Sequence, residues 1–421
     1  MFALVDATSY YCSAEQVFRP EWRHRPVIVL SNNDGCVVAA NRLAIELGIP
    51  KFQPYFKIAN LCRQHQVVVL SSNYELYADL SAKMMQVIGR FAPEQHIYSI
   101  DESFLSFKHC QQAIPCLATH ARRIRQTVWQ YTRLPVCVGI GSTLTLAKVA
   151  NKVAKLTSAS KGVCIIDNEV TRQATLASLP ISDVWGIGRK TAAKLALMNI
   201  HTAWKLANTS PTMMRKQFSI EIERTIRELN GIVCKQWDEA KADKQQIFST
   251  RSVGERITDI DSLHQALCMH ISIAAAKARK QQSLCKVMML FAHNSPHDSY
   301  PQSFKVNVNF TCATQCSAEM THAASSVIHQ LYRPGVHYYK VGVGLLDLVN
   351  SQHQQFDLFN ASKAKPQLMQ VLDNINHRYG SDTLYLGAQG AQGAQQKWTM
   401  HRDFLTPQYT TDWRHIPIIH C

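Results

Sequence analysis

The first 166 residues alternate short apolar runs with segments whose apolar residues recur at helical spacing. Helices are expected over residues 41–47, 74–91 and 117–131, and over a lysine-bearing segment that follows Ile140. The apolar runs predicted as strands are residues 2–5, 27–30, 36–39, 67–70, 136–140 and 163–166. Strands that alternate with helices bury their apolar sides by stacking the helices on a sheet, so a mixed α/β core is predicted.

The remaining residues indicate further domains, because a chain of 421 residues is longer than one core usually holds. Residues 170–235 are mostly helical in character, and the polar stretch 238–246 has the composition of a linker. Residues 247–347 form a second predicted α+β unit. Its expected strands are 287–292, 304–310 and 339–346, and its expected helices are 262–280 and 317–331.

Lys and Arg exceed Asp and Glu by 15. This surplus favours a polyanionic partner, although solubility alone explains it equally well. No membrane partner is expected, because no apolar window approaches the roughly 20 residues of a spanning helix and Asp6 interrupts the start of any signal peptide. The 13 cysteines are irregularly spaced without a C-x-x-C pair, which predicts reduced thiols and a cytoplasmic location.

A zinc site is a competing interpretation for one cluster of residues. His293, His297, Cys312 and Cys316 have spacings that could supply four ligands. Residues 304–310 alternate apolar and polar side chains directly before the cysteines, which favours a strand, and loose motifs of this kind often match by chance.

Three acidic residues stand in or beside apolar runs. Asp6 ends the first run, and Asp101 and Glu102 interrupt another. Burying an unpaired carboxylate costs several kcal/mol, so a bound metal is one reason to find acids there. Mg²⁺ prefers such oxygen ligands, and paired Mg²⁺ ions catalyse phosphoryl transfer. Neighbouring strand residues point to opposite faces, so Asp101 and Glu102 can share a site only at a bend or strand end. From the acids alone, a turn-capping Asp6 with a solvated acid pair is an equally good interpretation.

Longer blocks of sequence make the metal interpretation specific. They are Phe2–Asp6 with Tyr10 and Tyr11, Ser31–Val37, Ser71–Asp79 and Tyr98–Glu102. On these blocks, nearly the whole chain resembles the Y-family translesion DNA polymerases, in particular the UmuC branch of bacterial DNA polymerase V catalytic subunits and their plasmid-borne relatives. The resemblance implies a right-hand-like polymerase of α/β and α+β domains. The implied domains are a palm (1–10 and 75–166), fingers (11–74), a helical thumb with a helix-hairpin-helix (167–237), a little finger (247–347) and a C-terminal tail (348–421).

The resemblance also implies roles for individual residues. Asp6, Asp101 and Glu102 would be catalytic and, with the backbone of Ala7, would bind two Mg²⁺ ions. Tyr11, beside Tyr10 in the nucleotide site, matches the steric gate, a ring beneath the sugar that excludes a 2′-hydroxyl. Lys155 matches a lysine that reaches the incoming triphosphate. Family members usually carry a basic residue at the position of Ile45, and Arg42 is expected to substitute because its guanidinium suits phosphate.

A glycine-containing turn after the acidic core predicts contact with DNA. Gly186 and Gly188 flank Ile187, which lets the backbone turn tightly and present N–H groups to a phosphate, and Arg189 and Lys190 follow with positive charge. Such contacts position DNA without reading its sequence. The resemblance places this helix-hairpin-helix in the thumb.

The tail contains a second recognisable segment. Residues 355–359 resemble the clamp-binding peptide of bacterial polymerases, in which Gln355, Leu358 and Phe359 would occupy a pocket on the sliding clamp. Docking of this peptide on its own domain is the alternative. Residues 360–421 would help to contact a UmuD′-type accessory dimer, and RecA is a further candidate partner.

These features predict an error-prone, template-directed DNA polymerase that uses primer-template DNA and dNTPs. Its expected role is translesion synthesis in the bacterial SOS response to DNA damage. Two alternatives remain open from the sequence: a two-metal nuclease, and a catalytically silent DNA-binding regulatory subunit.

Overall fold

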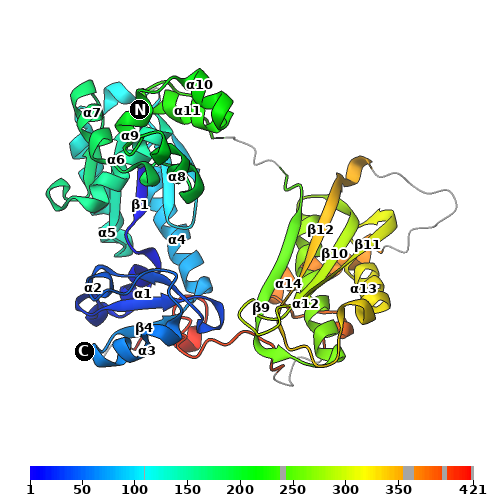
Figure 1. The fold of residues 1–421 in the computed structure, drawn as a ribbon. Helices are drawn as coiled ribbons and strands as arrows, with labels where there is room; N and C mark the ends of the chain where they lie inside the picture. The colour runs from blue at the N-terminus through cyan, green and yellow to red at the C-terminus, as the bar shows by residue number, and fades with distance from the viewer. Residues whose placement is uncertain (109, 238–242, 354–364, 391–395, 419–421) are drawn as a thin grey trace. The chain divides into compact units, whose positions relative to one another are not determined.

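The structure is a computed structural model that describes residues 1–108, 110–237, 243–353, 365–390 and 396–418. The chain forms two compact units, one of Met1–Glu239 with Asp403–Cys421 and one of Ala240–Arg402 (Figure 1). The predicted linker lies at the border between them. The tail is therefore divided: helix α14 (Pro366–Tyr379) belongs to the second unit and the last described residues belong to the first.

A five-stranded sheet lies at the centre of the first unit, in the order β5-β6-β1-β7-β8. The strands are β1 (Phe2–Ala7), β5 (Glu94–Ile97), β6 (Glu102–Ser106), β7 (Val136–Gly141) and β8 (Val163–Ile165). The central strand β1 runs antiparallel to both of its neighbours, β6 and β7. The predicted mixed α/β core is confirmed, since β7 and β8 run parallel and helices connect the strands.

Helices cover both faces of this sheet. Ala3 and Val5 pack into the core that includes α4 (Tyr74–Ile88) and α5 (Leu117–Thr132). Leu4 points to the opposite face, as strand alternation requires, and packs against α6 (Leu144–Leu156). Helix α6 packs so closely on the sheet that a Cβ at Gly139 would lie 2.1 Å from the backbone nitrogen of Asn151.

A smaller sheet in the same unit has the order β3-β2-β4. Its strands are β2 (Val27–Leu30), β3 (Val37–Ala40) and β4 (Val68–Ser71). The helices of this part are α1 (Tyr10–Phe18), α2 (Arg42–Glu46) and α3 (Tyr55–Gln64). The predicted helix over 41–47 is confirmed as α2, and it ends before Gly48, whose positive φ of 80° a residue without Cβ adopts at little cost.

The helical part of the first unit has its own apolar core. Its helices are α7 (Glu169–Ser178), α8 (Arg189–Leu197), α9 (Ala203–Ala207), α10 (Pro211–Gln217) and α11 (Ile220–Leu229). The prediction of a mostly helical stretch over 170–235 is confirmed.

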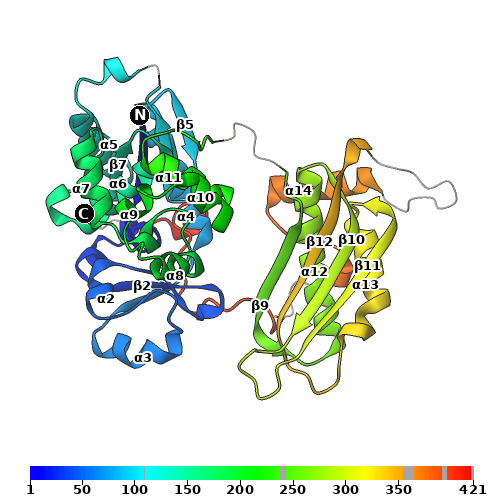
Figure 2. The same ribbon diagram turned by 45° about the horizontal axis from the view of Figure 1, so that its top comes forward.

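The second unit is a four-stranded antiparallel sheet in the order β11-β10-β12-β9, and Figures 1 and 2 show its strands side by side. The strands are β9 (Ile247–Ile257), β10 (Ser283–His293), β11 (Ser303–Thr314) and β12 (Tyr338–Asn350). Helices α12 (Ile260–Lys280) and α13 (Ser317–Leu331) share one core with the sheet. Strand β9 was not predicted, because it contains no continuous apolar run.

The structure describes most of the cysteines that were predicted to be reduced thiols, two of which were also considered as zinc ligands. None of the 12 cysteines that the structure describes forms a disulfide bond, and Cys312 and Cys316 are buried. Cys312 lies in β11, as the alternation of 304–310 indicates, and Cys316 immediately precedes α13. Across the described ranges, no helix is long and apolar enough to cross a membrane.

Candidate active site

Asp6 and Glu102 face each other across two central strands. Asp6 is the penultimate residue of β1 and Glu102 is the first residue of β6, and the two are register partners. Two residues further into the sheet, the register partners Leu4 and Phe104 pack on α6. Because strand side chains repeat every second residue, Asp6 and Glu102 lie on that same face.

Asp101 lies in the turn that leads into β6, so the acid pair occurs at a strand end, the position at which both side chains can reach one site. The carbonyl of Asp101 accepts a hydrogen bond from the amide of Ala7 at 2.9 Å, which joins the turn to β1. The hydroxyl of Ser99 donates to Asp101 Oδ1 at 2.6 Å. Asp6, Ala7, Asp101 and Glu102 are therefore brought together at one end of the sheet.

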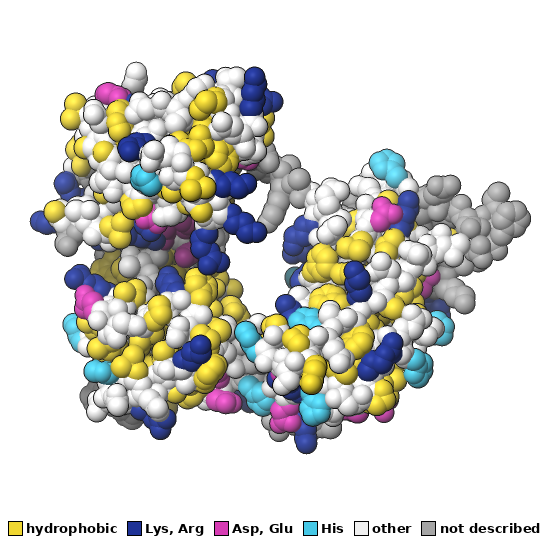
Figure 3. All heavy atoms as spheres, viewed as in Figure 1, with side chains coloured by type: hydrophobic (Ala, Val, Ile, Leu, Met, Phe, Trp, Pro, Cys, Tyr) yellow, Lys and Arg dark blue, Asp and Glu magenta, His cyan; other side chains and the backbone are white. Residues whose placement is uncertain are grey.

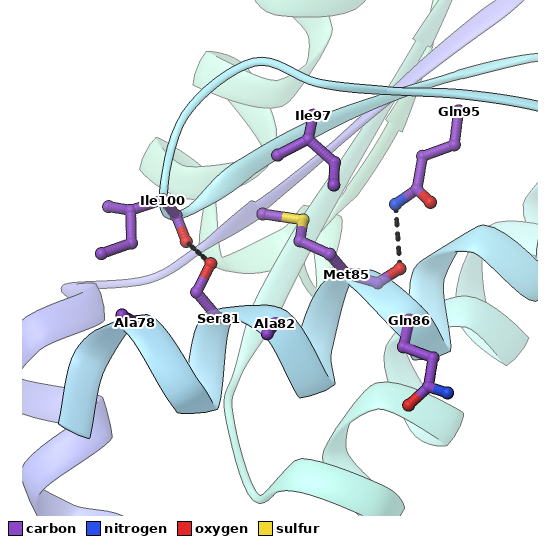
Figure 4. A pocket seen from close by; sticks show the side chains of 8 residues that line it. All are labelled: Ala78, Ser81, Ala82, Met85, Gln86, Gln95, Ile97 and Ile100. Carbon is purple, nitrogen blue, oxygen red and sulfur yellow. Dashed lines mark hydrogen bonds between the residues drawn. The ribbon is translucent and has the colours of Figure 1, made fainter. Parts of the chain in front are cut away.

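Helix α4 supports this turn from the other side (Figure 4). The hydroxyl of Ser81 donates to the carbonyl of Ile100 at 2.6 Å, and the side-chain amide of Gln95 donates to the carbonyl of Met85 at 2.9 Å. The turn that carries Asp101 is thus held between a strand and a helix, which restricts where its carboxylate can lie.

Two lysines of α6 neutralise the acids. Lys155 Nζ lies 2.5 Å from Asp6 Oδ1, and Lys148 Nζ lies 3.0 Å from Glu102 Oε2. The two lysines are seven residues apart, which is close to two helical turns, so they share one helix face. Lys148 also lies over the ring of Tyr98, 4.2 Å from its centroid.

The electrostatics of Asp6 favour a cation at this place. Its side chain is 9% exposed, and burial raises its pKa to about 7, while Lys155 opposes the rise and the charges of Glu102 and Asp101 add to it. Within the described part of the chain, no three Asp, Glu, His or Cys side chains lie close enough together to hold a metal ion. The Asp6 and Glu102 carboxylates contact lysines instead. By their chemistry, the hard carboxylate oxygens of Asp6, Asp101 and Glu102 are ligands of the kind that Mg²⁺ prefers.

The paired tyrosines occupy different environments. Tyr10 is buried and its hydroxyl donates to the carbonyl of Tyr77 at 2.5 Å. Tyr11 is half-buried and its ring stacks on that of Tyr77, with centroids 4.5 Å apart and an angle of 16°. Burial is the main cause that raises the pKa of Tyr11, followed by Tyr74 and then Asp101, so the Asp101 carboxylate is near enough to act on this hydroxyl.

The residues expected at the triphosphate lie apart in the structure. The Arg42 side chain is 86% exposed on α2 and pairs with Glu46 at 2.7 Å. Ile45, one helical turn along, is also exposed. Lys155 contacts Asp6, so of the predicted phosphate ligands it is the one that the structure brings to the acids.

The glycine turn has the expected backbone. Gly186 adopts a φ of 88°, and Gly188 immediately precedes α8. Arg189 and Lys190 are exposed at the start of that helix. Figure 3 shows Lys and Arg side chains gathered over α8 and α10, and the contributing residues include Arg189, Lys190, Lys194, Arg215 and Lys216.

Sequence reasoning did not find every residue that shapes the site. Lys148 pairs with Glu102, and its spacing from Lys155 was the available signal. Glu228 is fully buried and accepts hydrogen bonds from the amide and hydroxyl of Thr145, which fixes the start of α6. No sequence pattern predicts the contact between Glu228 and Thr145. The predicted clamp-binding residues Gln355, Leu358 and Phe359 lie outside the described residues.

Family comparisons agree with this arrangement. The impB/mucB/samB family matches residues 5–152, its C-terminal domain matches 244–358, and the family's HHH motif matches 171–200. The chain belongs to this family. Protein UmuC of Salmonella typhimurium is 41% identical over 98% of both chains, and Protein MucB of Escherichia coli is 38% identical over 99% of both. DNA polymerase IV of Moorella thermoacetica is 25% identical, covering 91% of this chain and 94% of its own.

Solved structures show the same fold. A Y-family DNA polymerase chimera of Dbh and Dpo4 superposes with a TM-score of 0.63 at 17% identity, covering 83% of this chain and all of its own. An insertion ternary complex of Dbh DNA polymerase gives a TM-score of 0.53 at 18% identity over the same shares. The predicted polymerase fold is confirmed, including the helix-hairpin-helix, whose family match contains Gly186 and Gly188.

Proposed function

We propose that this family member is an error-prone, template-directed DNA polymerase that performs translesion synthesis in the bacterial SOS response. The carrying observation is the register pair Asp6 and Glu102, with Asp101 in the adjoining turn and Tyr11 on the helix that follows β1. Membership of the family and the fold shared with Y-family polymerases support it.

The acids are proposed to hold two Mg²⁺ ions, with the carbonyl of Ala7 as an additional ligand. When bound, these ions would activate the primer 3′-hydroxyl as the nucleophile and offset the charge that develops on the phosphates. Lys155 can exchange its contact with Asp6 for the triphosphate of a dNTP. Arg42, whose side chain is exposed on α2, is the proposed second phosphate ligand. Lys148 is a positioning residue, since its ion pair orients Glu102.

Tyr11 is proposed to select the sugar. Its ring is supported on one side by Tyr77, so it cannot retreat from a ligand placed against its other side. A rigid ring beneath the sugar tolerates a deoxyribose and collides with a 2′-hydroxyl. Tyr10 serves this role indirectly, because its hydroxyl fixes the backbone of Tyr77.

Contacts with the phosphate backbone are proposed to hold the DNA. In the first unit, the amides around Gly186 and Gly188 and the charges of Arg189 and Lys190 would meet phosphates. In the second unit, Arg256 and Arg279 pair with Asp298 and Asp373, so they serve the fold first. The exposed strand lysines there, Lys286 and Lys305, are the better candidates for phosphate contact.

Arg189→Ala is expected to weaken binding of primer-template DNA by about threefold to tenfold at ~0.15 M salt, regardless of sequence. The slope of log affinity against log salt should fall by roughly 0.9, the value for one lost phosphate contact. Fluorescence anisotropy over a salt series measures both quantities. Arg224→Ala is the matched control, because Arg224 is paired with Glu221 at 2.9 Å in the same helical region. Equal salt slopes for the two variants would exclude Arg189 from the interface.

Protein partners are proposed to bind the tail. Gln355, Leu358 and Phe359 would attach the chain to the sliding clamp. A UmuD′-type accessory dimer would use the end of the chain, where Trp413 is 89% exposed and Ile416 and Ile418 are exposed as well. RecA is a further proposed partner, and the cytoplasm is the proposed location.

Extension of a labelled primer across a defined abasic site, with Mg²⁺ and dNTPs, tests the proposal. The full chain should lengthen the primer past the lesion, tested with and without clamp and accessory dimer. A two-metal nuclease would shorten the primer instead. A silent DNA-binding subunit would bind the substrate and leave its length unchanged under every condition.

A further inference from the structure

Residues 403–409 cross the first unit as a segment that we call the C-terminal strap. Its first residues are hydrogen-bonded to Ser71, the last residue of β4. The amide of Ser71 donates to the carbonyl of Phe404 at 3.0 Å, and the amide of Phe404 donates to the Ser71 hydroxyl at 3.0 Å. The amide of Asp403 donates to Asp34 Oδ2 at 2.8 Å. The strap is therefore hydrogen-bonded to the end of β4, just before α4, and to the turn between β2 and β3.

Buried polar contacts hold the middle of the strap. Thr406 is buried, and its hydroxyl accepts from the side-chain amide of Asn73 at 3.0 Å. The same amide also reaches the carbonyls of Thr406 and Pro407, at 3.3 and 3.4 Å. Asn73 itself is fully buried and caps α4 through its Oδ1. One asparagine thus fixes both the strap and the start of the helix that carries Tyr77.

The Thr406 hydroxyl leads directly to the proposed steric gate. It lies 3.2 Å from Oε1 of Glu15, a fully buried carboxyl on α1, and the Tyr77 hydroxyl donates to the same oxygen at 2.8 Å. Burial raises the pKa of Glu15 to about 7, and the two hydroxyls oppose that rise. Tyr77 in turn carries the stacked ring of Tyr11. A continuous chain of contacts therefore joins the strap to Tyr11.

Aromatic contacts hold the two ends of the strap. Tyr409 is buried and stacks on Phe18 of α1, with centroids 4.7 Å apart and an angle of 14°. Phe404 contacts the ring of Tyr55 edge-on at 5.8 Å. Such stacked and edge-on pairs contribute more than their buried area alone. Because both ends are held, Thr406 is presented to Glu15 in one position.

We propose that the C-terminal strap is a specificity element, in which Thr406 positions Glu15 and Tyr77 and thereby sets the place of the Tyr11 ring. This proposal rests on the proposed role of Tyr11 as the sugar gate. Residues 366–419 match a family model described as a domain of unknown function. The proposal gives the last part of that domain, which contains the strap, a role in substrate choice. Thr406, Glu15 and Asn73 act through Tyr77, so they are positioning residues.

Thr406→Val tests the strap, because it removes the hydroxyl and keeps the shape of the side chain. Asn73 retains its two carbonyl acceptors, so the strap should stay bound. The ratio of kcat/KM for dNTP to that for rNTP is expected to fall by about fivefold, because a loosened Tyr77 lets the Tyr11 ring yield to a 2′-hydroxyl. A loss of folded enzyme lowers both rates equally and leaves this ratio unchanged.

Thr411→Val is the matched control. Thr411 lies just beyond the strap and is exposed, and its hydroxyl donates to the side-chain oxygen of Gln408 rather than to Glu15. Tyr77→Phe is the second test variant, since it removes the donor to Glu15 and keeps the ring on which Tyr11 stacks. It should lower the ratio as Thr406→Val does, while Thr411→Val should keep the wild-type ratio.

Tyr11→Ala, assayed in parallel, separates failure of the strap from failure of the gate. If Tyr11→Ala admits ribonucleotides while Thr406→Val and Tyr77→Phe keep the wild-type ratio, the strap only stabilises the fold and the proposal is wrong. If Tyr11→Ala also keeps the wild-type ratio, the gate assignment fails, and the role of the strap in substrate choice fails with it.

Discussion

Asp101→Asn is expected to lower the rate of primer extension by about 10³-fold or more, equivalent to ~4 kcal/mol of transition-state stabilisation. The substitution removes a negative charge from the proposed metal ligands while keeping the size of the side chain. The fold should be unaffected. The amide oxygen of Asn can still accept from Ser99, and the contact with Ala7 uses the backbone of residue 101. Single-turnover extension with saturating dNTP measures the chemical step.

Asp167→Asn is the control for this experiment. Asp167 is an exposed acid of the same unit that lies just after β8, and its carboxylate contacts only the neighbouring Asn168 amide among the hydrogen bonds found in the described chain. Its replacement changes the net charge by the same amount and should leave extension within about twofold of wild type. Wild-type extension by Asp101→Asn would remove Asp101 from the catalytic site.

Tyr11→Ala is expected to raise the use of ribonucleotides relative to deoxynucleotides by about 10²-fold. The wild-type ring is held against Tyr77 in a stacked pair, so a 2′-hydroxyl placed against its free side meets an obstacle that cannot move away. Alanine leaves that space open. The measurement is the ratio of kcat/KM for dNTP to that for rNTP opposite the same template base.

Tyr131→Ala is the matched control for Tyr11→Ala. Tyr131 is exposed on α5, and its ring lies under Arg90 at 5.4 Å. It should keep the wild-type nucleotide preference. A Tyr11→Ala enzyme that still rejects ribonucleotides would show that another group beneath the sugar makes the selection, and Tyr74, which meets Tyr11 edge-on at 6.2 Å, would become the next residue to test.

Local sequence pattern was sufficient for many elements of both units. Strand β2 and helix α13 begin and end at the predicted residues, since each is a run of consistent periodicity with clear boundaries. Strand β9 was missed for the opposite reason. Its residues alternate between the core and solvent with Ser, Thr and Arg among them, so its pairing with β12 is visible only once the sheet has formed.

In the candidate site too, some features follow from local sequence and others depend on the fold. Asp6 stands at the end of a buried run, and that position made metal binding one of two equally good interpretations. Its partnership with Glu102 depends on the register between β1 and β6, and its contact with Lys155 depends on how closely α6 approaches the sheet. Neither quantity is encoded in a short window, because both are set by side chains on several elements at once.

The alternation of strands and helices, the positions of the acids and the glycine turn, and the family follow from local sequence, because periodicity and exact motifs are local properties of the chain. The tertiary structure was needed to show that lysines of α6 pair with Asp6 and Glu102, that the tail is divided between two units, and that Thr406 contacts Glu15. Residues distant along the chain meet through the packing of the whole unit, and a buried hydroxyl such as that of Thr406 has no pattern that marks its partner beforehand.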